Sequence, residues 1–330
     1  MKKILSVVTA LSLSLALLAG CGGSSSSSAP ASSAEGTSSA GGTFKVGIIQ
    51  MMEHPSLDEI RTAFLDEMAA LGYGEDQVEF LYQNGQNDAT VMNTICQQFV
   101  GDEVDAIVAI ATNAAQSAAA ATSDIPIIFS AVTDPVAAQL LSDPTAPDGN
   151  ATGTSDAIAV DQIFALAEEL TPGIETYGFI YNLGEVNSVS VISDAKAYLD
   201  EQDIAYVEST VTNSGEVSQS AQALLDQGAD AIFVPIDNTV ASAMTNLSDI
   251  ATQAQVPVYV AADSMVKDGA LATVGVNYTN LGKQTAAMAV KVLEGTPVSE
   301  IPVEVLDEYS VVVNEETAAA LGIDVSAYVQ

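Results

Sequence analysis

The chain has 330 residues, and its 43 Asp and Glu outnumber 8 Lys and Arg, which gives a formal net charge of −35 at pH 7. A protein this acidic repels nucleic acid and anionic bilayers, so both are excluded as electrostatic partners. The segment 44–330 is longer than a chain that usually folds around one hydrophobic core. Its length therefore predicts two lobes.

Residues 1–20 predict a signal peptide that lies outside the fold. Lys2 and Lys3 provide its positive start, an apolar run follows, and Leu18-Ala19-Gly20-Cys21 resembles a bacterial lipobox. The resemblance implies cleavage before Cys21 and a diacylglycerol on its sulfur. An ordinary signal peptide or an N-terminal membrane anchor is the alternative.

Residues 21–43 predict a flexible linker that follows the lipidated cysteine. The segment is rich in Gly, Ser and Ala. Such a chain buries too little apolar surface to offset the entropy lost on ordering it. We expect it to tether the folded lobes to the outer side of the bacterial cell membrane.

Strand and helix patterns alternate through the rest of the chain. Apolar runs predict strands at 44–50, 78–84, 105–110, 125–130, 176–182, 204–210, 230–236, 256–261, 270–276 and, as one long extended run, 303–314. Amphipathic patterns predict helices at 55–72, 88–100, 112–122, 158–170, 186–201, 214–227, 239–254, 279–293 and 315–321. Continuous apolar strands between amphipathic helices are typical of parallel sheets covered on both faces. The fold class is therefore α/β, with two doubly wound parallel-sheet lobes.

A faint internal repeat supports the two lobes. Residues 104–118 and 229–243 both read as Asp-Ala-Ile, an apolar run, a polar group and an Ala/Ser-rich helix, and 125–135 parallels 256–266. The period is domain-sized, which indicates pseudo-symmetric lobes rather than a solenoid.

Polar side chains follow the strands, where ligands bind in open parallel sheets. The candidate ligand-binding residues are Glu53, His54, Thr112, Gln116, Thr133, Asp134, Asn187, Ser188, Asp237, Asn238, Thr239, Asp263 and Ser264. Helix N-termini attract a carboxylate, and Asp237 or Asp263 could hold an ammonium group. A cleft with both features suits a zwitterion such as an amino acid.

Helix capping is the alternative role for each of these residues, because Ser, Thr, Asn and Asp are preferred N-caps. In Asp237-Asn238-Thr239 one residue suffices as the cap, which leaves two for a ligand. Glu53-His54-Pro55 also reads as a helix start with Pro in the first turn. Cys96 lies in a helical apolar pattern and predicts a buried, inert thiol.

Enzyme activity has little support in the sequence. It contains neither a G-x-S-x-G elbow nor a G-x-x-x-x-G-K-[ST] phosphate loop. With Cys21 lipidated, Cys96 is the one remaining thiol and His54 the one histidine, so a Cys/His metal cluster cannot form. The strand-end residues are mostly amides and hydroxyls, which favour binding over proton transfer. We expect no catalytic residue, metal or cofactor, and rank an acid-rich hydrolase far behind.

Several motifs together resemble ABC-transporter substrate-binding lipoproteins, in the group that includes tryptophan- and other aromatic amino-acid-binding proteins. They are the lipobox, EHP after the first strand, YNLGEVNS, VPIDNT and DSMVKDGALATVGVNYTNLGKQT. The resemblance implies the type I periplasmic-binding-protein fold with three crossing strands. It divides the chain into lobe one, 44–153 plus 280–306, and lobe two, 154–279 plus 307–330, with hinge segments near 152–156, 277–281 and 305–309.

The resemblance also implies roles for the candidate residues. Asn187 and Ser188 would hold the ligand carboxylate, and Asp237 the ammonium, helped by Asn238 and Thr239. The residues that would line lobe one are Thr112, Gln116, Thr133 and Asp134, with Glu53 and His54 at the rim. Met51-Met52 suits an aromatic or large aliphatic side chain.

The resemblance implies a function in import. A monomeric protein would capture its ligand by lobe closure and deliver it to a membrane permease with its ATPase. The alternative is a sensor lipoprotein that uses the same fold to signal to a membrane kinase or chemoreceptor. Both need the same cleft, so the sequence does not separate them.

Overall fold

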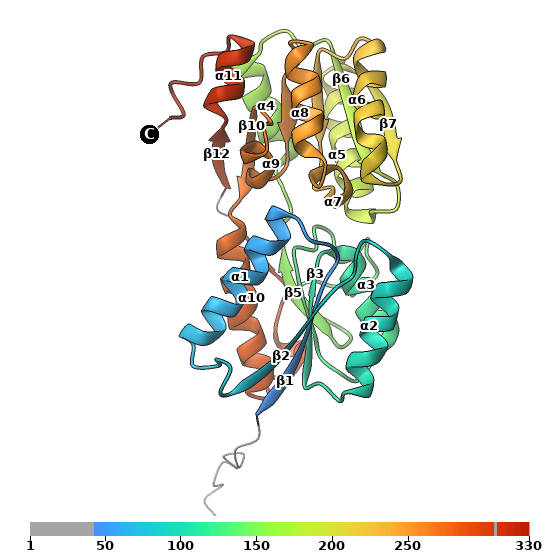
Figure 1. The fold of residues 1–330 in the computed structure, drawn as a ribbon, viewed down its shortest axis with the longest axis vertical. Helices are drawn as coiled ribbons and strands as arrows, with labels where there is room; N and C mark the ends of the chain where they lie inside the picture. The colour runs from blue at the N-terminus through green and yellow to red at the C-terminus, as the bar shows by residue number, and fades with distance from the viewer. Residues whose placement is uncertain (1–42, 307–308, 330) are drawn as a thin grey trace, which may run out of the picture. The chain divides into compact units, whose positions relative to one another are not determined.

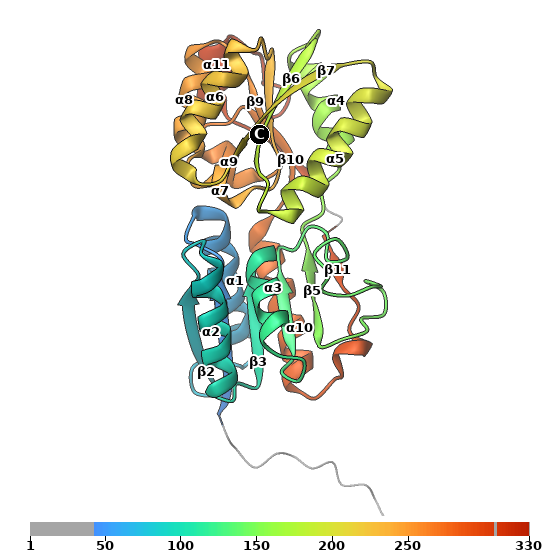
Figure 2. The ribbon, with the colours of Figure 1, turned by 90° about the vertical axis from the view of Figure 1, so that its right-hand side faces the viewer.

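The computed structural model describes residues 43–306 and 309–329. The predicted signal peptide, Cys21 and most of the linker lie outside the described residues. So do residues 307 and 308 of the predicted third hinge segment. The described residues form two six-stranded sheets, each with helices on both faces (Figures 1 and 2).

The first sheet has the strand order β11-β5-β4-β3-β1-β2, and all its pairs are parallel. Its strands are β1 (Phe44–Gln50), β2 (Val78–Asn84), β3 (Ala106–Ile110), β4 (Ile127–Ser130), β5 (Ala151–Ser155) and β11 (Glu304–Val305). Helices α1 (Pro55–Ala70) and α10 (Tyr278–Leu293) cover one face, and α2 (Ala89–Gly101) and α3 (Thr112–Ala121) cover the other (Figure 1). We call this sheet with its four helices lobe one.

The second sheet has the order β12-β10-β9-β8-β6-β7, in which only β12 is antiparallel. Its strands are β6 (Thr176–Asn182), β7 (Ala205–Val211), β8 (Ala231–Val234), β9 (Val258–Val260), β10 (Ala272–Val276) and β12 (Tyr309–Val313). The α-helices are α4 (Val160–Leu170), α5 (Val186–Glu201), α6 (Val217–Asp226), α7 (Asn238–Ala241), α8 (Met244–Gln253), α9 (Asp263–Lys267) and α11 (Glu315–Leu321), and short 3₁₀ turns occupy Ser214–Glu216 and, in lobe one, Val298–Glu300. This sheet and its helices form lobe two.

Most predicted elements are confirmed, and three differences matter. The predicted helix 239–254 is two helices, because the chain leaves helical geometry at Ala243, where φ is −124°. The predicted extended run 303–314 contains two separate strands, since β11 pairs with β5 in lobe one and β12 pairs with β10 in lobe two. Strand β5 was not predicted, because its sequence ATGTS lacks a run of branched apolar residues.

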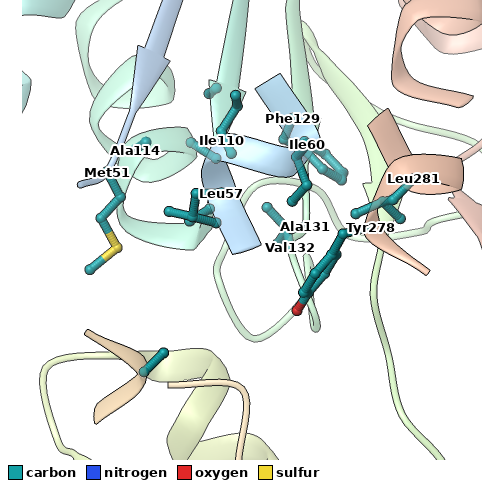
Figure 3. Close-up of a cluster of buried hydrophobic side chains, with 14 of the residues drawn as sticks. Met51, Leu57, Ile60, Ile110, Ala114, Phe129, Ala131, Val132, Tyr278 and Leu281 are labelled. Carbon is teal, nitrogen blue, oxygen red and sulfur yellow. The ribbon is translucent and has the colours of Figure 1, made fainter. Parts of the chain in front are cut away.

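Buried apolar side chains hold the lobes together. The larger cluster contains Met51, Leu57 and Val132 of lobe one together with Val240 and Met265 of lobe two. Figure 3 shows its lobe-one part, where the Tyr278 ring lies against the cluster and its hydroxyl points away from it. A second cluster fills the other face of the lobe-two sheet.

Cys96 is buried in lobe one. Burial raises the pKa of its thiol to about 12, which fits the predicted inert role.

Candidate functional site

The carboxyl ends of β5, β4 and β3 bring three polar residues to one edge of lobe one. Asp156 directly follows β5, Thr133 follows β4 and Thr112 follows β3. These strands are neighbours in the sheet, and parallel neighbours lie about 4.8 Å apart. The edge therefore presents a short row of hydrogen-bonding groups.

The backbone at this edge is strained. Ala111 has φ 78° and Ala131 has φ 56°, a region that residues with a side chain seldom adopt. Each alanine comes immediately after a strand, just before Thr112 and Val132. Strained positions of this kind concentrate at ligand-binding sites.

Asp156 is fully buried and has only neutral donors among its described hydrogen-bond partners. The Thr133 hydroxyl donates to its Oδ1 at 2.8 Å, and the Tyr278 hydroxyl lies 3.3 Å from its Oδ2. Burial raises the pKa of Asp156 to about 6, although both hydrogen bonds lower it. At neutral pH this site therefore holds a negative charge without a cationic partner. Sequence reasoning missed Asp156, because no strand was predicted before it.

Thr112 begins α3, and its hydroxyl is buried without a hydrogen-bond partner. The preceding residue, Ala111, has no side chain that could cap the helix. The first N–H groups of α3 and the Thr112 hydroxyl are therefore suited to an anion. Gln116, also predicted as a site residue, instead donates to the Ala138 carbonyl at 3.0 Å.

In lobe two, Asp237 caps the short helix α7. Its Oδ1 accepts from Val240 N at 2.8 Å, and its Oδ2 accepts from Asn182 N at 2.6 Å. Burial and the neighbouring Glu185 carboxylate raise its pKa. The residue is 1% exposed, so it has the environment of a structural group. Its predicted contact with an ammonium stays a prediction.

Glu185 binds the other two residues of the Asp237-Asn238-Thr239 motif. Its fully buried carboxylate accepts from the backbone N and side chain of Asn238, at 2.9 and 2.7 Å, and from the backbone N and hydroxyl of Thr239, at 2.9 and 2.7 Å. Glu185 follows β6 and so met the strand-end criterion, but its four contacts depend on a fold that brings β6 and β8 together.

Asn187 and Ser188 both donate to the carbonyl of Ile236, at 2.6 and 3.1 Å. Their donors, which were predicted to hold a carboxylate, are thus engaged within lobe two. The Asn187 Oδ1 atom is buried and has no described partner, so this side chain still offers an acceptor.

The remaining predicted residues lie where the lobes meet. His54 Nε2 is 3.0 Å from Asn238 Oδ1, and the Ser56 and Ser264 hydroxyls are in contact across the lobes. Asp134 accepts from Ser190 of lobe two at 3.0 Å. The lobes also meet through hydrogen bonds from Asn87 to Thr239, at 3.2 Å, and from Asn113 to the Gly184 carbonyl, at 3.4 Å.

Two predicted residues have weaker ties to this junction. Glu53 is exposed, and its carboxylate is 3.4 Å from the Tyr82 hydroxyl within lobe one. Asp263 begins α9, and one of its oxygens is buried without a partner while the other is 3.5 Å from Lys267.

Comparison with known proteins agrees with this architecture. Residues 45–330 match the family described as ABC transporter substrate binding protein. The tyrosine-binding protein of Clostridioides difficile (strain R20291) is 38% identical over 321 residues, which are 97% of this chain and 92% of that protein.

Two solved structures, one with a ligand and one without, allow the arrangement of the lobes to be compared with that of relatives. An ABC domain from Streptococcus pneumonia in complex with L-Trp is 36% identical, with a TM-score of 0.83. A ligand-free, open substrate-binding protein with adhesive properties from Clostridium difficile is 41% identical, with a TM-score of 0.67. Both alignments cover 86% of this chain and 96% of the other.

The structural similarity is higher to the complex although its sequence identity is lower. The lobes here are therefore arranged more as in the ligand-bound relative. Among the described residues, no helix is both long and apolar enough to span a membrane. The fold is the two-lobed type I periplasmic-binding-protein fold, and the chain belongs to the family of ABC transporter substrate-binding proteins.

Proposed function

We propose that this protein is the extracytoplasmic binding lipoprotein of an ABC importer and that its ligand is an amino acid with an aromatic or large aliphatic side chain. The named ligands of two relatives, tyrosine and L-Trp, support this class. The lipobox at Cys21 supports the lipid anchor, and the family supports delivery to a permease and its ATPase.

The observation that carries the proposal is the buried charge of Asp156. Its two described donors are neutral hydroxyls, so the carboxylate lacks the positive charge that would offset its burial. A ligand ammonium would supply this charge. Because both oxygens of Asp237 already accept from backbone N–H groups, we assign the ammonium to Asp156 with Thr133 rather than to Asp237.

The ligand carboxylate fits the N-terminus of α3. The Thr112 hydroxyl and the first N–H groups of the helix are donors, and the helix end carries a partial positive charge. In the sheet, Thr133 lies between Thr112 and Asp156. Both charged groups of one amino acid can therefore contact this edge of lobe one.

Apolar residues of both lobes meet next to this edge. Met51 and Val132 belong to the same buried cluster as Val240 and Met265. An aromatic or large aliphatic side chain would pack well among thioethers and branched side chains. Contacts from both lobes would make the closed arrangement favourable only with ligand bound, which is how binding drives closure.

A thermal-shift panel of L-amino acids tests the proposal. A ligand at 100 times its Kd adds about 2.7 kcal/mol of stability. We expect L-tyrosine, L-tryptophan or a large aliphatic amino acid to raise Tm, and a sugar alcohol such as myo-inositol to leave it unchanged. A Tm that no amino acid raises would reject the proposal.

A further inference from the structure

His54 is the only histidine in the chain and lies at the junction of the two lobes. It precedes α1 of lobe one, and its Nε2 is 3.0 Å from Oδ1 of Asn238, the first residue of α7 in lobe two. The imidazole is 6% exposed, and its Nδ1 is buried without a hydrogen-bond partner among the described residues. A cavity of about 300 Å³, also lined by residues of both lobes, adjoins the ring.

The Glu185 carboxylate determines which atom of the Asn238 side chain faces His54. A carboxylate only accepts hydrogen bonds, so the amide nitrogen must face Glu185, from which it is 2.7 Å away. The amide oxygen then faces His54 and also only accepts. The imidazole must therefore carry its proton on Nε2, and in the neutral ring Nδ1 is a bare acceptor.

We infer that His54 is a positioning residue for lobe closure, which forms its bond to Asn238 as the neutral Nε2–H tautomer, so that acid weakens closure and releases the ligand. Protonation would add a second N–H, on Nδ1, for which the described residues of the closed junction provide no hydrogen-bond acceptor. In an open protein the ring would be hydrated and would accept the proton freely. This inference rests on the proposed function, since it describes how the same cleft is regulated.

The charged groups around the ring set the strength of this effect. Asp58 on α1 raises the pKa of His54, but burial lowers it by more, and the net direction is down. Glu53 and Asp268 line the same cavity as His54, and Glu185 lies behind Asn238. Asp237 lies beside Glu185, and burial and the carboxylate of Glu185 raise its pKa.

The expected size follows from proton linkage. An exposed histidine has a pKa of about 6.5, so below that pH the open state binds a proton that the closed state excludes. Affinity then falls about tenfold for each pH unit below 6.5, until the pKa of the closed state is reached. From this group we expect weaker binding at pH 5.5 than at pH 7.5, by up to about tenfold.

The first test locks the closed state without any ligand. The hydroxyls of Ser56 and Ser264 touch across the lobes, so a Ser56→Cys, Ser264→Cys variant can be oxidised to a disulfide. The imidazole is then titrated by NMR, where a single histidine gives unambiguous signals. We expect a pKa below 6.5 in the oxidised variant and a higher value after reduction. A pKa at or above 6.5 in the locked protein would overturn the inference.

The second test compares affinities for L-tyrosine and L-tryptophan at pH 7.5 and 5.5. In His54→Gln the amide can donate to Asn238 as Nε2 does, but it does not titrate. We expect this variant, compared with its own affinity at pH 7.5, to lose most of the decrease that the wild type shows at pH 5.5. Asp156, with a pKa of about 6, titrates equally in both proteins and so cancels. An unchanged decrease in His54→Gln would reject the role of His54.

The two tests separate failure of this inference from failure of the proposed function. If neither amino acid binds at pH 7.5, the proposed ligand is wrong, and the locked variant still decides whether closure excludes the proton. If either amino acid binds and the locked protein shows an ordinary pKa, the ligand assignment stands and the role of His54 is rejected.

Discussion

Replacing Asp156 by Asn is expected to stabilise the ligand-free protein while it abolishes amino-acid binding. Asn keeps an oxygen that can accept from Thr133, and its amide can donate to the Tyr278 hydroxyl. It removes the buried charge, whose cost follows from the pKa. A rise from 3.8 in the unfolded chain to about 6 in the fold corresponds to about 3 kcal/mol at neutral pH.

The pH dependence of this gain identifies its cause. The pKa of Asp156 is higher in the folded state, so the folded protein binds more protons between about pH 4 and 6. Stability from this group is therefore complete below about pH 4 and is lost as the pH rises through 6. The Asn variant cannot ionise, so it should match the wild type near pH 4 and exceed it by about 3 kcal/mol at pH 7.5.

Urea unfolding near pH 4 and at pH 7.5 measures the difference in stability between Asp156→Asn and the wild type. Calorimetry at pH 7.5 measures binding of L-tyrosine and L-tryptophan. Asp134→Asn is a matched control, because Asp134 is a partly exposed carboxylate at the same junction. A variant of Asp156 that is less stable than the wild type at pH 7.5, or one that binds with unchanged affinity, would refute the reasoning.

Three further substitutions test separate parts of the structure. Thr112→Val should weaken amino-acid binding by about 10- to 150-fold, the value of a hydrogen bond to a charged group, while Thr112→Ser should preserve it. Equal affinities of the Val and Ser variants in calorimetry would contradict the carboxylate site. Asp237→Ala leaves two buried N–H groups unpaired and should lower the free energy of unfolding by about 2–6 kcal/mol in urea. Asp237→Asn should lower it by less and should still bind the amino acid. An Ala variant that is fully stable but does not bind would restore Asp237 as the ammonium partner. Gly282→Ala places a methyl carbon 2.5 Å from the Ile60 carbonyl oxygen, so α1 and α10 must separate. This should lower the free energy of unfolding by about 1–3 kcal/mol, measured as a lower Tm in thermal unfolding. An unchanged Tm would contradict this close packing.

The sequence predicted the two lobes because continuous apolar strands and amphipathic helices have clear periods. It failed where periodicity carries little information. Strand β5 is made of small and polar residues, and its place in the sheet comes from pairing with β4 and β11. In the sequence 303–314 shows one extended pattern, so only the partners of β11 and β12 reveal that this segment contributes to both sheets.

The candidate site was predicted in outline but not in its division of roles. Thr112, Thr133 and His54 follow strands and lie at the junction or on its lobe-one edge, as the strand-end rule expects. The rule cannot tell which polar groups form hydrogen bonds within their own lobe, as Asn187 does with the carbonyl of Ile236. Asp156 was missed for a simpler reason, since it follows the one strand of lobe one that the pattern did not reveal.

The most direct test of the account is calorimetric titration with L-tyrosine and with two analogues that each lack one charged group. Tyramine lacks the carboxylate that would contact α3, and 3-(4-hydroxyphenyl)propionate lacks the ammonium that would contact Asp156. We predict saturable one-to-one binding of L-tyrosine, or of L-tryptophan if the pocket prefers an indole, and at least tenfold weaker binding of each matching analogue. Equal binding of the amino acid and its analogues, or no binding of any amino acid, would contradict capture of a zwitterion in this cleft.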